Sequence, residues 1–176
     1  RVAKHDHVRF VGDQLYVVAR EAEDQTLRLH TLSVMGNSAI YLDLLNVAYG
    51  SVAGDVSVSF GADSVFVSDS GWHYGLTATS DVVKISLADP LAPIEVGTTS
   101  LPTELDQLVF TGEGLVGLGD TRIYAANGGS QRLGTVTGFD IEGSEVNSVL
   151  LGMDYRWYSS WVSYDDQMLN VDQANQ

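Results

Sequence analysis

Two segments combine aromatic side chains with polar neighbours, residues 68–75 and residues 153–161. Aromatic rings have flat apolar faces, and polar groups beside them can hold a sugar or a peptide in place. The same rings could instead pack over their own loops or against a neighbouring unit, and Trp161 also fits the core of a strand. We predict a binding surface here. Its candidate ligand-binding residues are Trp72, His73, Tyr74, Tyr155, Arg156, Trp157 and Tyr158.

Catalytic and metal-binding patterns are weak in this chain. It has no Gly-x-Ser-x-Gly, His-Glu-x-x-His or Gly-x-x-x-x-Gly-Lys motif, which argues against the common hydrolase and nucleotide sites. His5 and His7 have a spacing that could place two imidazoles on one side of a strand, although such a pair near a terminus is usually incidental. Asp165, Asp166 and Asp172 lack the spacing of a calcium loop. We therefore assign no catalytic residue, no metal and no cofactor.

The composition is that of an acidic globular protein. Hydrophobic residues make up 44%, and 23 acids against 9 bases give a net charge of −14. Such a surface repels phosphate backbones, so we expect no nucleic-acid partner. No window resembles a membrane span, and the absence of cysteine excludes disulfides and thiolate sites. Because the chain begins at Arg1, we expect a processed product, with any signal peptide outside this sequence.

An internal repeat of 50 residues is the strongest signal in the sequence. Three segments share a Phe, then an acid after two residues, then an apolar run: Phe10–Val18, Phe60–Ser68 and Phe110–Leu118. A weaker fourth copy covers residues 161–171. Each copy has the apolar runs and the turn residues of a β-hairpin. We expect the three Phe residues to hold equivalent positions and to be buried between neighbouring units.

Two further strands follow each hairpin. Third strands are predicted at residues 26–32, 81–87 and 135–141, and fourth strands at residues 39–45, 94–99 and 146–151. Four strands in about 50 residues is typical of a propeller blade. We predict an all-β fold, a β-propeller segment of about three and a half four-stranded antiparallel blades, with a β-sandwich as the alternative. The repeats cover about residues 8–45, 56–99, 105–151 and, incomplete, 161–176.

Residues 81–97 resemble a known family. Their strand is followed by Asp89-Pro90, Pro93 and a final Val96-Gly97, which is similar to the passage between the third and fourth strands of secreted prokaryotic β-propeller domains distantly related to WD40 repeats. The prolines suit a rigid turn that needs few backbone donors. The copies at 26–45 and 135–151 lack these prolines, and the Trp-Asp dipeptide of WD40 blades is absent. The resemblance implies the fold and an extracytoplasmic or secreted location.

The predicted long loops are residues 68–80, 127–134 and 152–160, and blade topology puts all three on one side. We therefore expect a binding or scaffolding module of an exported protein that contacts protein or polysaccharide through this side. The alternatives are a fragment of a propeller hydrolase, with its catalytic residues mostly outside this chain, and a purely architectural segment. Closed propellers have ~4–8 blades, so we expect the remaining blades in the same gene or in another chain.

Overall fold

The computed structural model describes residues 7–21, 26–47, 55–70, 80–101, 104–112, 114–124, 130–140 and 145–154. These residues form twelve strands, and the described part of the chain contains no helix. None of its elements is therefore a helix that could cross a membrane. The predicted all-β class is confirmed.

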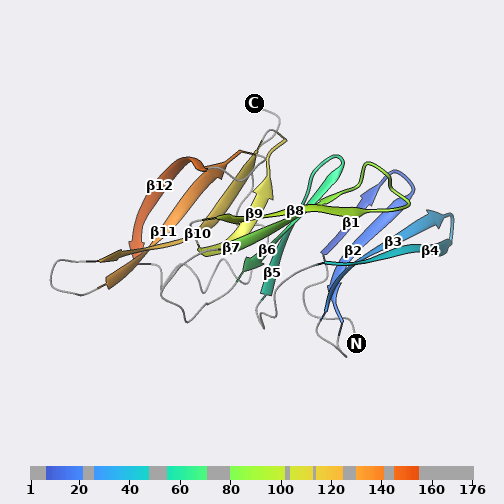
Figure 1. The fold of residues 1–176 in the computed structure, drawn as a ribbon, viewed down its shortest axis with the longest axis horizontal. Helices are drawn as coiled ribbons and strands as arrows, with labels where there is room; N and C mark the ends of the chain where they lie inside the picture. The colour runs from blue at the N-terminus through green and yellow to red at the C-terminus, as the bar shows by residue number, and fades with distance from the viewer. Residues whose placement is uncertain are drawn as a thin grey trace.

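The strands form three antiparallel sheets of four, each in simple chain order. The first sheet contains β1 (His7–Val11), β2 (Gln14–Arg20), β3 (Leu27–Met35) and β4 (Ser38–Asn46). The second contains β5 (Asp55–Phe60), β6 (Ser64–Ser70), β7 (Ser80–Ser86) and β8 (Ile94–Leu101). The third contains β9 (Glu104–Phe110), β10 (Leu115–Tyr124), β11 (Ser130–Phe139) and β12 (Glu145–Asp154). Figure 1 shows the three sheets one after another across the molecule.

The repeated Phe residues hold the same register in all three sheets. Phe10 pairs with Leu15, Phe60 pairs with Val65, and Phe110 pairs with Leu115, each time at the closed end of the first hairpin. The prediction of equivalent positions is confirmed. The turns also match the sequence signals, since Gly12 has a φ of 59°, the left-handed conformation that a two-residue hairpin turn needs.

A backbone hydrogen bond recurs beside the acid of the repeat. The Val34 amide donates to the Asp13 carbonyl at 2.8 Å, and the Leu87 amide donates to the Asp63 carbonyl at 2.7 Å. In both sheets this bond joins the first turn to the end of the third strand. The turn acids therefore lie at equivalent places, as the sequence repeat predicts.

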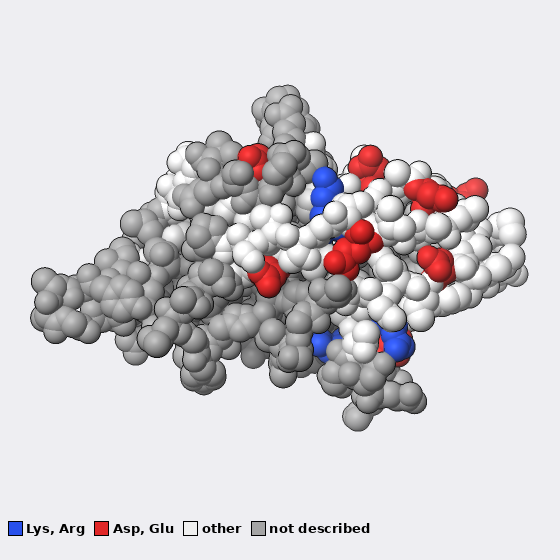
Figure 2. All heavy atoms as spheres, in the orientation of Figure 1, with Lys and Arg blue, Asp and Glu red and all other residues white. Residues whose placement is uncertain are grey.

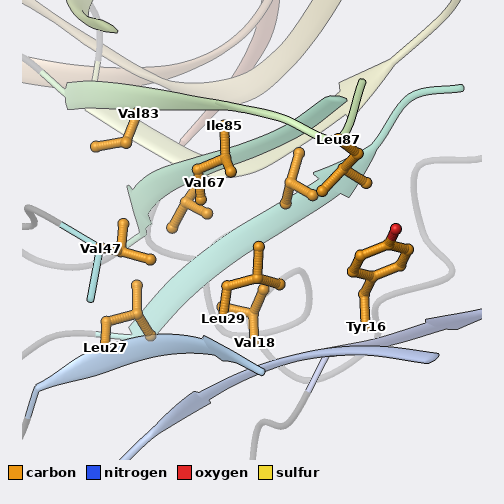
Figure 3. Packing of buried hydrophobic residues seen from close by; sticks show 10 residues of the cluster. Tyr16, Val18, Leu27, Leu29, Val47, Val67, Val83, Ile85 and Leu87 are labelled. Carbon is orange, nitrogen blue, oxygen red and sulfur yellow. The ribbon is translucent and has the colours of Figure 1, made fainter. Parts of the chain in front are cut away.

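The first and second sheets pack face to face through an apolar core. In Figure 3, Tyr16, Val18, Leu27 and Leu29 of β2 and β3 point toward the side chains of β6 and β7. Alternation along β6 and β7 places every second side chain on this face. The second-sheet members of the cluster are Val65, Val67, Val83 and Ile85, joined by Leu87 just beyond β7.

The opposite face of the second sheet packs against the third sheet. Phe66 and Val82 alternate along their strands with the residues that face the first sheet, so they point to the opposite side. There they pack in a second core cluster, which also contains Leu108, Leu115 and Phe139. The middle sheet is thus covered on both faces. The fourth strands β4 and β8, at the far edges of their sheets, are mostly exposed.

The prediction that all three repeated Phe residues are buried is wrong for Phe10. Phe60 and Phe110 are half-buried and pack against the first and second core clusters respectively. Phe10 is 61% exposed. Phe60 and Phe110 point toward the sheet that precedes their own, whereas no described sheet precedes β1–β4.

Candidate functional site

The aromatic residues predicted to bind a ligand lie outside the described residues. Two groups are involved, the first in segment 71–79 and the second after the end of β12 at Asp154. The fourth repeat, at residues 161–176, and its acidic residues also lie outside the described residues. The residues concerned are Trp72, His73, Tyr74, Tyr155, Arg156, Trp157 and Tyr158.

The strands leading to these two segments have a defined relative direction. Ser57 Oγ accepts a hydrogen bond from the Leu108 amide at 2.9 Å, and Ser59 Oγ accepts one from the Phe110 amide at 2.6 Å. A step of two residues along β5 therefore matches a step of two residues along β9 in the same direction. The two first strands lie side by side and run parallel.

Because β5 and β9 run parallel, we can say which strands of the second and third sheets end on the same side of the two sheets. In a sheet of four antiparallel strands in chain order, the second and fourth strands run opposite to the first. The ends of β6 at Ser70 and β12 at Asp154 consequently lie on one side of the second and third sheets. The chain leaves the described structure from that side as it enters both aromatic segments.

One predicted long loop is shorter than expected. The segment 127–134 was expected to connect two strands, but residues 130–134 belong to β11. They continue the ladder with β10 as far as the pair Tyr124 and Ser130. Glycine and polar residues suggested a loop there, whereas pairing with the long strand β10 holds them in the sheet. Likewise, residues 152–154 extend β12 into the predicted loop 152–160.

A polar cluster that sequence reasoning did not identify lies on the first sheet. The His30 ring bonds the Tyr41 hydroxyl through Nδ1 at 3.0 Å and lies 3.2 Å from Glu21 Oε1 through Nε2. Arg28 Nη1 is 3.6 Å from the same carboxylate oxygen. Arg28 and His30 are two residues apart on β3, so their side chains lie on the same face of the strand. That spacing is the sequence signal that could have identified the cluster.

The cluster contacts the His30 ring through both of its nitrogen atoms. Both ring nitrogens have polar partners, so His30 is poorly placed to ligate a metal. The pKa of Tyr41 lies above its ordinary value, because partial burial disfavours the phenolate and the carboxylates of Asp43 and Glu21 repel it. A phenol held neutral can serve as hydrogen-bond donor. We interpret the cluster as a hydrogen-bond network on the surface of the first sheet that fixes the orientation of the His30 ring.

His7 makes a contact between two sheets. Its Nε2 lies 3.2 Å from the carbonyl oxygen of Val56, which joins β1 to β5 of the next sheet. His5, the other imidazole of the pair considered above, lies outside the described residues. Within the described ranges, no three His, Asp or Glu side chains gather around a common point where a metal could bind.

The turn between β7 and β8 has the geometry that its sequence predicts. The Leu91 amide donates to Asp89 Oδ1 at 3.0 Å, and the Ala92 amide donates to the Asp89 carbonyl at 3.1 Å. Pro93 is buried just before β8 begins. Asp89 thus organises the turn through its own side chain.

A scan against protein-family models and a search of curated proteins returned no match to this chain.

Proposed function

We propose that the chain is a segment of a β-propeller that serves as a binding module, with its ligand surface on the side where β6 and β12 end. The supporting observation is the arrangement of the strands that border the aromatic segments. Both segments follow strands that end on the same side of parallel-aligned sheets. Loops that a rigid scaffold presents on one side are where binding surfaces usually form.

Three features favour propeller blades over a sandwich. A sandwich has two sheets, each with one face toward solvent, whereas the middle sheet here packs on both faces. Successive sheets repeat one register of the Phe residues. The first strands β5 and β9 lie side by side, as the inner strands of adjacent blades do around a central axis.

The ligand class follows from chemistry. Trp72, Tyr74, Trp157 and Tyr158 supply flat rings, while Arg156 supplies a hydrogen-bond fork. A polysaccharide or a protein segment suits such a surface. Nucleic acid does not, because the chain carries a net charge of −14. Figure 2 shows acidic side chains spread over the visible described surface, with few basic ones among them. We place the module in an exported protein, on the resemblance of residues 81–97.

A binding survey tests this function. The chain would be screened against a glycan array and a peptide library, followed by titration of each hit. Replacing Trp72, Tyr74, Trp157 and Tyr158 together by Ala is expected to weaken the hit at least about tenfold, as loss of aromatic anchors does. As a control, Leu91→Ala removes an exposed apolar side chain from the turn before β8 and should leave affinity unchanged. Undiminished binding by the fourfold variant would overturn the assignment.

A further inference from the structure

Leu118 is a buried residue on the face of the third sheet that points away from the second sheet. On the same strand, Leu115 packs toward the second sheet, and a Cβ at Gly117 would meet Leu105 and Phe139 of that core. Because side chains alternate along a strand, Leu118 points to the opposite side. It is only 2% exposed, yet it belongs to neither of the two core clusters of the described residues.

Neighbours within one sheet do not bury a side chain to this degree. Leu15 and Val17 lie on β2, the second strand of the first sheet, and they alternate with residues that face the second sheet. No described sheet covers the side to which they point, and both are only half-buried. Leu118 lies on β10, the second strand of its own sheet. An element outside the described residues must therefore cover it.

The burial of this face decreases from the inner to the outer strands. Leu118 on β10 lies in one row with Val136 on β11 and Val149 on β12. Val136 is half-buried, and Val149 is 54% exposed. In the first sheet, which the four-stranded second sheet covers, the corresponding residues of β2 and β3 are Val18 and Leu29, and both are 0% exposed. The cover on the third sheet is therefore narrower than a sheet of four strands.

The fourth repeat has the length and the register of such a narrow cover. It lies outside the described residues, and residues 161–171 have the sequence pattern of a single hairpin. Its turn acid is Asp166, which corresponds to Glu113 of the third repeat. Trp161 stands five residues before Asp166, as Leu108 stands five residues before Glu113. Leu108 is a buried residue that faces the preceding sheet, so we expect the same of Trp161.

We infer that the fourth repeat packs as a two-stranded hairpin on the outward face of β9 and β10, with Trp161 over Leu118. The contact between the second and third sheets supplies the register. There, Ser57 Oγ accepts a hydrogen bond from the Leu108 amide, and Ser57 is the direct cross-strand partner of Ser68. Ser68 has the same register in the second sheet as Leu118 in the third. The position of Leu108 in the next repeat therefore meets Leu118.

The side-chain volumes of the two interfaces compensate for each other. Phe110 stacks on Phe66 between the second and third sheets. In the inferred interface, the smaller residues Ser163 and Val116 have these two places. The pair at Leu118 is instead larger than its counterpart, because a Leu and a Trp replace a Ser and a Leu. Cores accept such exchanges when the total volume is kept.

This packing deepens the proposed function, because it holds the second aromatic segment at both ends. Six residues, 155–160, separate the end of β12 from Trp161, and they include the candidate ligand-binding residues Tyr155–Tyr158. Two residues, 102 and 103, suffice for the corresponding connection from β8 to β9. If the hairpin's first strand runs parallel to β9, as β9 does to β5, this segment stays on the proposed ligand side.

Introduced thiols can test this contact, because the chain has no cysteine. Val116→Cys with Ser163→Cys is the test pair, since it copies the stacked pair Phe66 and Phe110. We expect dibromobimane, a reagent that joins two neighbouring thiols, to link this pair within one chain. Val149→Cys with Ser163→Cys is the matched control, because Val149 lies on the same face but on the outer strand, and it should not be linked. Mass spectrometry of the intact protein separates links within one chain from links between two.

The reactivity of a thiol at position 118 gives an independent measurement. Leu118→Cys should react slowly with a maleimide, and at least about tenfold faster when Trp161→Ala is added, because loss of the covering ring favours local opening. Phe10→Ala is the control, since Phe10 is exposed on the first sheet, and it should leave the rate unchanged. Circular dichroism would verify that every variant keeps its sheets.

Several results would overturn the inference. They are the absence of a link in the test pair, an equal yield in both pairs, and links only between chains, which would assign the cover to a second copy. A maleimide rate that Trp161→Ala leaves unchanged would also overturn it, because other residues would then cover Leu118. The inference rests on the blade arrangement proposed above, but no measurement here involves a ligand. Its failure is therefore distinguishable from failure of the proposed binding function.

Discussion

Phe110 stacks on Phe66, with ring centroids 5.4 Å apart and ring planes inclined by 18°. Phe66 belongs to the second strand of one sheet and Phe110 to the first strand of the next. Tyr16 has the register of Phe66 in the first sheet, and Phe60 packs against the cluster that contains Tyr16. Phe60 and Phe110 therefore each pack against the sheet that precedes their own.

A double-mutant cycle measures this contact. Phe66→Ala, Phe110→Ala and the double variant would be unfolded in urea. We expect a coupling free energy of about 0.5–1.5 kcal/mol, the range of aromatic pairs. Phe66 and Phe10 form the control cycle, because Phe66 packs toward the third sheet and Phe10 is exposed on the first, and they should couple by less than about 0.3 kcal/mol. Equal coupling in both cycles would refute a specific stacking contribution.

Ser57 supplies a buried hydrogen bond between sheets. Its hydroxyl accepts from the Leu108 amide, so Ser57→Ala leaves a buried donor without that acceptor. We expect the free energy of unfolding to fall by about 1–3 kcal/mol. Ser38→Ala, at an exposed position, should change it by less than about 0.5 kcal/mol. Equal effects of the two variants in urea titrations would contradict the inter-sheet bond.

Gly117 is required where the third sheet packs closely. A Cβ at this position would lie 2.5 Å from Leu105 Cδ2 and 3.1 Å from Phe139 Cε2, both in the core between the second and third sheets. We expect Gly117→Ala to destabilise the fold by about 1–3 kcal/mol. Gly97→Ala is the matched control, because no atom lies within 4 Å of the Cβ it would add. A thermal melt in which both variants behave alike would contradict this packing.

Tyr16 should make the fold sensitive to alkali. Burial, and to a lesser extent Asp89, raises the pKa of its phenol above the ordinary 10.0. The folded state therefore holds this proton more tightly than the unfolded chain. The resulting stability is complete below about pH 10 and is lost as the pH rises toward the folded pKa.

Tyr16→Phe tests the alkaline effect, because it keeps the ring and removes the titrating group. Urea midpoints measured at about pH 8 and about pH 10.5, on either side of the ordinary tyrosine pKa, should fall less in the variant than in the parent chain. An equal fall in both proteins would show that other groups cause the alkaline destabilisation.

Sequence periodicity predicted the repeat register well and the burial of its members less well. The spacing of Phe10, Phe60 and Phe110 depends on local hairpin geometry, which turn residues and alternation encode. Burial also depends on which sheet lies across the face. The sequence of one repeat does not carry that information, so Phe10 was expected in a core that no described sheet completes.

The polar cluster of the first sheet was missed for a related reason. Arg28 and His30 alternate on one strand, which is visible in the sequence, but Tyr41 meets His30 only through the pairing of β3 with β4. That pairing contains a register shift between Thr31 and Leu32, and a shift of one residue exchanges the faces of a strand. The first residues of β11, 130–134, were expected in a loop because they lack apolar alternation, whereas the rest of the strand was predicted.

The unfolding free energies of three equivalent variants test the central claim most directly. The claim is that Phe60 and Phe110 pack against the sheet that precedes their own, and that Phe10 has no such sheet among the described residues. Phe60→Ala and Phe110→Ala should each cost about 2–4 kcal/mol, somewhat below a fully buried Phe, and Phe10→Ala, at a position that is 61% exposed, less than about 0.5 kcal/mol. Equal costs at all three positions, or costs below about 1 kcal/mol for both Phe60 and Phe110, would contradict the account.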